Sequence, residues 1–313
     1  MAALLGLMAL GAGTVWWSMN HYVDNVQRIP DAFPHVREKE RPVKPESAEG
    51  ALNFVLAGVD SRSDLPTTGN GRETDLWRPG AQRTDSLMLL HLTADRRKAF
   101  VVAIPRDSWV PIRGHGWAKI NAAYSWGGPP LLIDTVEKLT GIRIDHFGVI
   151  DWHGFRSLTD AVGGVNITID SDDSYDSSAK RHWKPGTYTM NGEQALAYVR
   201  QRHGLPRGDL DRIERQQQFL RSLLGKVRGE IDVTQPLRLN KVLNSVTSTV
   251  SVDDRLSNSD LRDLALQLRN LRRESFVTAP VARFDHIDGQ SVVILDAAKS
   301  QALWHAIAID RVS

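Results

Sequence analysis

The 313-residue sequence contains no cysteine, which excludes disulfide bonds, thiolate metal sites and cysteine nucleophiles. It also lacks an excess of one charge. The 39 Lys and Arg residues against 37 Asp and Glu leave a formal net charge of +2, too near neutral to indicate a nucleic-acid partner. Several catalytic motifs are missing too: Gly-x-Gly-x-x-Gly, Gly-Lys-Ser/Thr after a strand, Gly-x-Ser-x-Gly and His-Glu-x-x-His.

Histidine offers little metal chemistry either, because the ten histidines show no paired spacing on a helix that would predict a zinc site. The chemical groups that remain are arginine, aspartate and a few lysines. Carboxylates hold hard cations and guanidinium groups spread over phosphate oxygens, so this set suits magnesium and phosphoryl groups.

The N-terminus begins with an uncharged stretch. Residues 2–19 carry no ionisable side chain, and this length lies at the lower limit for crossing a bilayer. Trp16, Trp17 and Tyr22 suit the membrane interface. A cleaved signal peptide is the alternative, but no clean small-x-small cleavage site follows. No Lys or Arg precedes the run, so the positive-inside rule does not fix its orientation. We expect residues 1–22 to be a single transmembrane anchor, with the rest outside the cytoplasm.

Residues 23–50 read as a spacer. They contain four prolines and a dense run of charge from Arg37 to Arg41. Such a composition is typical of a semi-rigid linker rather than of a core. No second linker and no internal repeat follows, so we predict one α/β domain over residues 51–313.

Charged residues stand at the ends of three successive predicted strands, which cover residues 52–60, 87–92 and 98–104. The pairs are Asp60 with Arg62, Arg83 with Asp85, and Arg106 with Asp107. Strands of α/β proteins present ligand residues at their ends, so these pairs are candidates for a site. Surface ion pairs are the alternative, and an aspartate at a strand end is also a common turn former.

A second charged stretch runs from Arg200 to Gln217 and contains five arginines in sixteen residues. Clustered guanidinium groups suit bidentate recognition of phosphate or carboxylate. A solvated charge run is the alternative, because acids at 209, 211 and 214 could neutralise it, and we expect Arg207 to be solvated. A predicted helix with Asn191 as N-cap and Gln194 reaching back precedes this stretch. The His-Gly-Leu-Pro sequence at 203–206 favours leaving that helix.

Gln216 is the unusual residue of the next predicted helix, over residues 211–228. At 100° per residue it falls inside the apolar stripe that Ile213, Leu220 and Leu224 help to form. A buried amide needs a hydrogen-bond partner, which could be a ligand oxygen, a neighbouring arginine or the backbone.

Six motifs in this order resemble the LytR-CpsA-Psr family of cell-envelope proteins over residues 50–228. They are Gly58-Val-Asp60-Ser-Arg62, Arg83-Thr-Asp85-Ser-Leu-Met, Ile104-Pro-Arg106-Asp107, Lys119-Ile-Asn-Ala-Ala-Tyr124, Leu196-Ala-Tyr-Val-Arg200-Gln-Arg202 and Asp211-Arg212-Ile-Glu-Arg215-Gln216-Gln217. We therefore expect a single three-layer α-β-α domain with a central mixed sheet, preceded by one N-terminal transmembrane helix.

The resemblance implies a phosphotransferase. Such a protein would move a cell-wall glycopolymer from a polyprenyl-pyrophosphate carrier to peptidoglycan and form a phosphodiester. The family also implies an apolar channel for the polyprenyl tail within the α/β body. Two alternatives stay open: a polyprenyl-pyrophosphate hydrolase, and a non-catalytic envelope regulator that binds the lipid carrier.

Site residues are carried over from the same motifs. The resemblance implies that Asp60 and Asp85 hold Mg²⁺ or Mn²⁺ against the pyrophosphate. Its oxygens would be clamped by Arg83, Arg106, Arg200 and Arg202, with Lys119 and Gln216 completing the binding shell. Supporting positions are Arg62, Asp107, Arg212 and Arg215. Asp107 or a metal ligand would accept the proton of the attacking hydroxyl.

Overall fold

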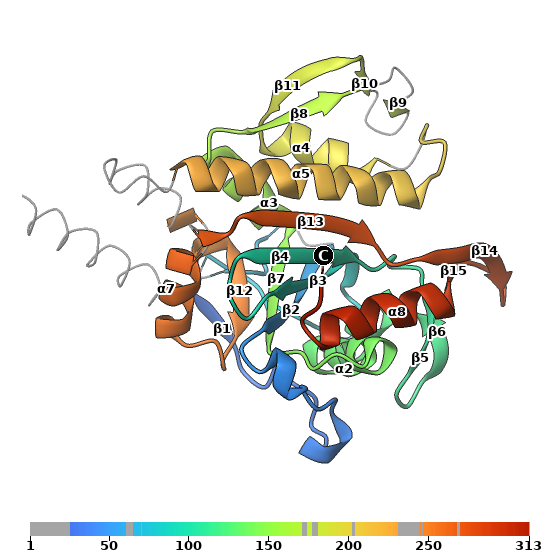
Figure 1. Ribbon diagram of the computed structural model, residues 1–313. Helices are drawn as coiled ribbons and strands as arrows, with labels where there is room; N and C mark the ends of the chain where they lie inside the picture. Colours follow the sequence, from blue (N-terminus) through green and yellow to red (C-terminus); the bar gives the residue numbers. More distant parts are fainter. Residues whose placement is uncertain are drawn as a thin grey trace, which may run out of the picture.

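The structure is a computed structural model that describes residues 26–60, 65–69, 71–170, 174–176, 181–201, 204–230, 244–245, 247–267 and 270–312. Within these residues, seven strands form one mixed sheet in the order β1-β12-β7-β2-β3-β4-β13. Helices cover both faces of the sheet (Figure 1). The predicted α/β fold with a central mixed sheet is confirmed.

The central strands follow the apolar runs of the sequence. The bounds are β1 Gln27–Ile29, β2 Leu52–Asp60, β3 Arg83–Leu92, β4 Lys98–Ala103, β7 His146–Asp151, β12 Val250–Asp253 and β13 Arg273–Thr278. β2 pairs antiparallel with β3 and parallel with β7, whereas β3 pairs antiparallel with β4. Alternate residues face opposite sides, so Leu87 and Leu89 join the main core while Met88 contributes to a second cluster with Ile213.

Two layers of helices enclose this sheet. The described helices include α2 Asn121–Thr140, α3 Trp152–Ala161, α4 Gly192–Arg200, α5 Asp209–Glu230, α7 Asn258–Gln267 and α8 Ala297–Ala308. α5 lies over one face with α3 and α4, and α2 and α8 lie under the other (Figure 1). α2 is kinked where Gly127 and Gly128 leave helical geometry, just before Pro129.

In the part of the chain that the structure describes, four two-stranded sheets flank the central one. The antiparallel pairs are β5 Trp109–Ile112 with β6 Gly116–Lys119, β8 Val165–Ile169 with β11 Gly186–Met190, β9 Ser174–Asp176 with β10 Arg181–Trp183, and β14 Val281–Ile287 with β15 Gln290–Leu295. β8 and β11 lie beyond α4 and α5, far from the central sheet (Figure 1). The β5–β6 hairpin and α8 lie on the opposite side.

Residues 26–50 do not behave as the expected spacer. β1 is an edge strand of the central sheet, and two short 3₁₀ helices follow at Glu38–Glu40 and Glu46–Ala48. Phe33 and Arg41 are buried. Arg41 donates from Nε to Glu137 Oε2 at 2.9 Å and from Nη2 to Glu137 Oε1 at 2.6 Å. The buried pair with Glu137 thus holds this segment against α2, and the composition of the segment does not reveal that partner.

The predicted anchor over residues 1–22 lies outside the described residues. Among the helices that are described, none combines the length and the apolar character needed to cross a bilayer.

Candidate functional site

One edge of the central sheet gathers the predicted charged strand ends. β2 ends at Asp60, β3 begins at Arg83, and β4 is followed by Arg106. Because β3 is antiparallel to both neighbours, these three positions meet at the same edge, and Asp60 is paired with Arg83 in the register. The sequence prediction that the three strand ends form one cluster agrees with this arrangement.

A β-bulge places Asp85 in this cluster. The register of β2 and β3 pairs Gly58 with Ser86 and Val59 with Thr84, so Asp85 has no opposite residue. Bulges redirect a side chain and increase local twist, and they are frequent beside active sites. With this bulge, the side chains of Ser86 and Met88 lie on the sheet face under α5, whereas Asp85 pairs with Arg106 at the charged edge.

Arg106 links the carboxylates of this edge. Its Nη1 forms an ion pair with Asp85 Oδ1, and its Nε lies 3.7 Å from Asp107 Oδ2. Lys119 Nζ, at the end of β6, lies 3.3 Å from Asp107 Oδ1. The Nε of Arg106 is buried and has no hydrogen-bond partner among the described residues. A buried donor of this kind has a hydrogen bond to offer to an anionic ligand.

A second ion pair lies beside the first. Arg200, the last residue of α4, places Nη2 3.4 Å from Asp60 Oδ2, and its guanidinium carbon lies 5.2 Å from the ring centroid of Trp152. Arg83 is exposed next to this pair. The chain does leave the helix after Arg200, since Gln201 has φ −55° and ψ 134°. Trp152 was not among the predicted site residues, because its contact with Arg200 depends on how α3 and α4 pack.

Asp209 and Arg212 form the floor of the site at the start of α5. Arg212 is 3% exposed and its Nη2 lies 2.5 Å from Asp209 Oδ1. Burial raises the pKa of Asp209 and lowers that of Arg212, and both residues feel the charges of Arg106, Asp85 and Asp107. Sequence reasoning treated Asp209 only as a neutralising charge and missed its burial beside the arginines.

Arg215 and Gln216 are turned toward the protein interior. Arg215 Nη1 donates to Gln201 Oε1 at 2.7 Å, and its guanidinium carbon lies 4.4 Å from the centroid of the Tyr198 ring. Gln216 is 8% exposed and donates from Nε2 to the Val199 carbonyl oxygen at 3.5 Å. The backbone alternative for Gln216 is therefore present, but this hydrogen bond is at the upper limit of length.

An apolar cavity of about 260 Å³ lies between the sheet and helices α3, α4 and α5. The described residues that line it are Leu56, Ala57, Gly58, Ser86, Met88, Gly148, Val149, Ile150, Trp152, Phe155, Leu158, Val199, Gln216, Phe219, Leu220, Leu223 and Val250. Glycine at positions 58 and 148 leaves space at the sheet side of the cavity. A Cβ atom at either position would lie only 3.2 Å from a side-chain atom of Ser86 or Leu56. The resemblance implied such a channel, although no single stretch of sequence could reveal it.

The cavity reaches the charged edge. Its lining residues Gly58, Ser86 and Val199 lie one or two positions from Asp60, Asp85 and Arg200. Gln216 and Trp152 belong to the lining as well. An apolar chain in the cavity would therefore end beside the arginines and carboxylates. We name the site formed by Asp60, Arg83, Asp85, Arg106, Asp107, Lys119, Arg200 and Arg212 the edge site.

Arg62 and Arg202 lie outside the described residues, so their predicted contacts stay predictions. Arg207 is exposed, as expected, and pairs with Asp211 and Glu214 at 2.6 Å and 2.5 Å.

The carboxylates of the edge site suit a magnesium ion shared with a phosphate substrate. Asp60 and Asp85 lie on adjacent strands, and Mg²⁺ commonly takes one or two carboxylates with phosphate oxygens and water as its other ligands. Among the described residues, no group of three His, Cys, Asp or Glu side chains could hold a metal by itself. The donor set fits an ion that the substrate helps to bind.

Comparison with known proteins gives a consistent family match. The LytR_cpsA_psr family model matches residues 25–309. The cell wall biosynthesis protein LcpA of Corynebacterium glutamicum is 34% identical over 292 residues, covering 82% of this chain and 56% of LcpA. The polyisoprenyl-teichoic acid–peptidoglycan teichoic acid transferase TagU of Bacillus cereus strain AH820 is 30% identical over 225 residues, covering 71% of this chain and 68% of TagU.

Solved structures show the same fold. Protein gbs0355 of Streptococcus agalactiae superposes with a TM-score of 0.71 at 26% identity, covering 84% of this chain and 89% of that protein. TagT with bound octaprenyl pyrophosphate superposes with a TM-score of 0.63 at 24% identity, covering 87% of this chain and 96% of that one.

The chain spans just over half the length of some relatives, with 56% of LcpA and 60% of the probable cell wall biosynthesis protein LcpB of Corynebacterium glutamicum. The family match nevertheless covers nearly the whole chain. The chain belongs to the LytR_cpsA_psr family.

Proposed function

We propose that this protein transfers a cell-wall glycopolymer from a polyprenyl-pyrophosphate carrier to peptidoglycan. The observation that carries the proposal is the junction of the apolar cavity with the edge site. A lipid tail suits an apolar cavity. A pyrophosphate suits the guanidinium and carboxylate groups at its end. The name of the TagU relative, a transferase from polyisoprenyl-teichoic acid to peptidoglycan, describes the same kind of reaction.

The reaction exchanges one phosphorus–oxygen bond for another. A hydroxyl oxygen of the acceptor attacks the phosphorus next to the glycan, and the bond from that phosphorus to the bridging oxygen breaks. Polyprenyl phosphate leaves with the electron pair, and the hydroxyl proton passes to a carboxylate of the site or to water. The product is a phosphodiester between glycopolymer and peptidoglycan.

The arginines would stabilise the charge that develops on the phosphoryl oxygens. Arg106 and Arg200 already stand beside carboxylates, so a phosphate oxygen can replace those partners without moving the backbone. Arg83 is exposed at the same edge. Lys119, which is paired with Asp107, can turn to contact a phosphate oxygen as well. Asp60 and Asp85 would hold Mg²⁺, which when bound supplies further neutralisation of the pyrophosphate charge.

Asp107 is a candidate proton acceptor. It lies between Arg106 and Lys119, so a carboxylate oxygen is fixed in place at the edge where the acceptor hydroxyl must arrive. Asp60 and Asp85 are the other candidates. We further propose that residues 1–22 anchor the protein in the membrane with the domain on the outer side, where the carrier and peptidoglycan meet.

The test is a transfer assay with the full chain in detergent, a polyprenyl-pyrophosphate-linked glycan, peptidoglycan and Mg²⁺. We expect a wall-linked phosphodiester that disappears with EDTA and in the Asp85→Ala and Arg200→Ala variants. Arg207→Ala is the matched control and should keep full activity. Free phosphorylated glycan as the product would indicate hydrolysis instead. Carrier binding without turnover would indicate a non-catalytic role, and either result would overturn the proposal.

A further inference from the structure

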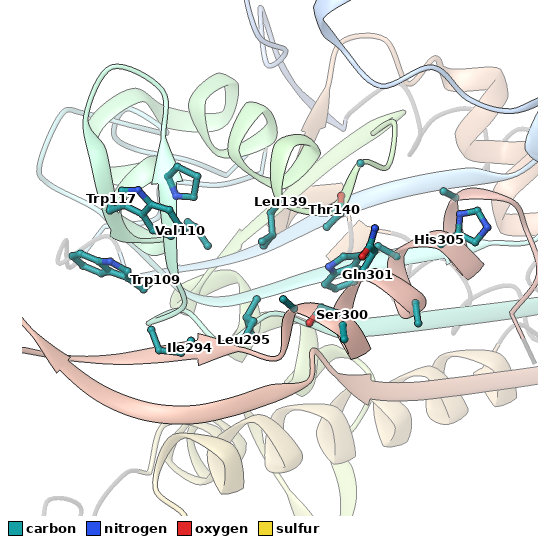
Figure 2. Close-up of a pocket in the computed structure, with 17 residues that line it drawn as sticks. Trp109, Val110, Trp117, Leu139, Thr140, Ile294, Leu295, Ser300, Gln301 and His305 are labelled. Atoms are coloured by element: carbon teal, nitrogen blue, oxygen red, sulfur yellow. The ribbon is translucent and has the colours of Figure 1, made fainter.

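A second hollow lies on the other face of the sheet, away from the apolar cavity. It is a cleft of about 1070 Å³ between the β5–β6 hairpin, the end of α2, the end of β15 and helix α8. Figure 2 shows Trp109 and Trp117 on the hairpin at one end and Gln301 and His305 on α8 at the other. We name it the aromatic cleft. The proposed reaction, as described above, makes no use of it.

The lining of the aromatic cleft combines aromatic rings with neutral polar groups. Trp109, Trp117 and Trp304 contribute rings, and Trp117 is 62% exposed. Thr140, Ser300, Gln301 and His305 contribute the polar side chains. None of the described residues that line the cleft is Lys, Arg, Asp or Glu. A phosphate-rich or acidic ligand would be poorly served by such a surface, because burial of its charge would find no partner.

Two polar atoms in the wall of the cleft support a polar but uncharged ligand. Ser300 and Trp304 are 5% and 4% exposed, and Ser300 Oγ and Trp304 Nε1 have no hydrogen-bond partner among the described residues. The two residues are one turn apart on α8 and line the same cleft. Buried polar groups are normally paired, so a ligand that carries hydroxyl and amide groups would complete them after a small side-chain rotation.

These features match the chemistry of a sugar. The aliphatic face of a pyranose ring packs flat on an indole, while its hydroxyl groups exchange hydrogen bonds with neutral side chains. An exposed tryptophan such as Trp117 gives a rigid surface at low entropic cost. The volume exceeds that of a single monosaccharide site, so several rings of a chain can be held.

The cleft is connected to the edge site by short stretches of backbone. Trp109 is two residues after Asp107 and pairs with Lys119 in the hairpin register. On the other side, Val293 N donates to the Asp107 carbonyl oxygen at 2.9 Å, and the next residues Ile294 and Leu295 line the cleft. The cleft therefore begins where Asp107 and Lys119 meet.

We infer that the aromatic cleft binds the uncharged sugar backbone of the acceptor glycan strand of peptidoglycan. This inference rests on the proposed function. In-line displacement requires the attacking oxygen to approach the phosphorus opposite the leaving group. The leaving polyprenyl phosphate belongs to the apolar cavity on the α5 face, so the acceptor approaches from the α8 face, where the aromatic cleft lies.

The first test measures binding alone. The full chain is titrated with chitohexaose, an uncharged oligomer of N-acetylglucosamine, by calorimetry and tryptophan fluorescence. We expect saturable binding that Trp117→Ala weakens at least about tenfold, since a stacked ring acts as an anchor, and that Gln301→Ala weakens by about threefold. Trp126→Ala is the matched control, because Trp126 is 42% exposed but stacks on His115 outside the cleft lining. No binding by the unsubstituted chain, or equal binding by the Trp117 and Trp126 variants, overturns the inference.

The second test separates this inference from the proposed function. In the transfer assay, Trp117→Ala should raise the KM for peptidoglycan and leave the KM for the lipid-linked donor unchanged. Transfer with an unchanged acceptor KM overturns the cleft assignment while the proposed function stands. A raised donor KM with an unchanged acceptor KM assigns the cleft to the donor glycan and also overturns it. Chitohexaose binding without any transfer overturns the proposed function and, with it, the acceptor role of the cleft, which would then be a glycan-binding site only.

Discussion

The two faces of the central sheet carry hollows of opposite character. On the α5 face, the apolar cavity holds about 260 Å³ between aliphatic and phenylalanine side chains, with Ser86 and Gln216 near its charged end. On the α8 face, the aromatic cleft holds about 1070 Å³ between tryptophans and neutral polar groups. A lipid needs only the exclusion of water, whereas a sugar needs flat rings and hydrogen bonds. This contrast is the basis of our proposal that two chemically different molecules reach the edge site from opposite faces.

The largest loss of transfer activity is expected from a change at Arg106, in the edge site between the two hollows. Arg106→Ala removes the side chain that joins Asp85 and Asp107, and we expect transfer to fall by about 10³-fold, as for loss of a charge-stabilising donor in other active sites. Binding of chitohexaose to the cleft should change little, because Arg106 does not line it.

The control for this variant is Arg106→Lys, which keeps the charge but loses the planar fork. It should recover part of the transfer rate in single-turnover assays with folding checked by circular dichroism. An Arg106→Ala protein that transfers at more than a tenth of the normal rate would contradict the assignment.

A large loss of folding stability is expected from a change at Arg41, which holds residues 26–50 against α2 on the α8 face of the sheet. Arg41→Ala leaves the buried Glu137 of α2 without its bidentate partner and should lower the free energy of unfolding by about 3–4 kcal/mol. Amide exchange should accelerate in α2, next to the aromatic cleft, more than in α5. Arg37→Ala, whose pair with Glu40 is exposed, should change stability by less than about 0.5 kcal/mol. Equal losses of unfolding free energy in both variants, measured by urea unfolding, would contradict the role of the buried Arg41–Glu137 pair in holding residues 26–50.

A moderate effect is expected from filling the apolar cavity. Leu220→Trp adds volume inside the lining and should weaken binding of a fluorescent polyprenyl pyrophosphate by about 10- to 30-fold, which corresponds to about 1.4–2 kcal/mol, because the added ring takes space that the lipid tail needs. Leu224→Trp, one turn further along α5 and outside the lining, is the control. Binding of chitohexaose should be the same in both variants. If both ligands weaken together, the two hollows do not act separately.

The smallest effect is expected at Gln216. Its hydrogen bond to the Val199 carbonyl is 3.5 Å long, so Gln216→Leu should change the free energy of unfolding by less than about 1 kcal/mol. If its amide contacts the pyrophosphate, transfer should fall by about fivefold, the equivalent of one hydrogen bond. Thermal unfolding and transfer rates measured on one preparation distinguish the roles. A lowered melting temperature with unchanged transfer would make Gln216 a structural residue.

Much of the fold could be predicted because its central strands are apolar runs with charged ends. The strand ending at Asp60 appeared at its predicted place, and the Asn191–Gln194 capping box formed as expected. β3 covers the predicted residues 87–92 but begins earlier, at Arg83. The short strand β1 escaped prediction because three residues carry no periodicity, and it is held by pairing with β12 from the far end of the sequence. The burial of Arg41 could not be predicted from composition either, because it depends on Glu137, which lies 96 residues away in the sequence.

The site was predictable to the extent that it is local. Arg106 and Asp107 follow a strand, and the sheet brings them to Asp85 by pairing rules alone. Asp209 and Trp152 were missed because their roles depend on how α3 and α5 pack over the sheet. The two hollows were equally hidden. Each is the space left between elements, and no residue marks such a space in the sequence.

The bulge at Asp85 makes the length of β3 as important as its composition. Side chains alternate between the two faces of a strand, and the bulge interrupts this alternation. Deletion of a single residue between Arg83 and Ser86 would therefore move the side chains before it to the opposite face. Arg83 would turn away from the edge site while Ser86 and Met88 kept their places in the cavity lining, although neither Arg83 nor the cavity lining had been substituted. Redesign for a different carrier should therefore vary side chains within this strand and keep its residue count fixed.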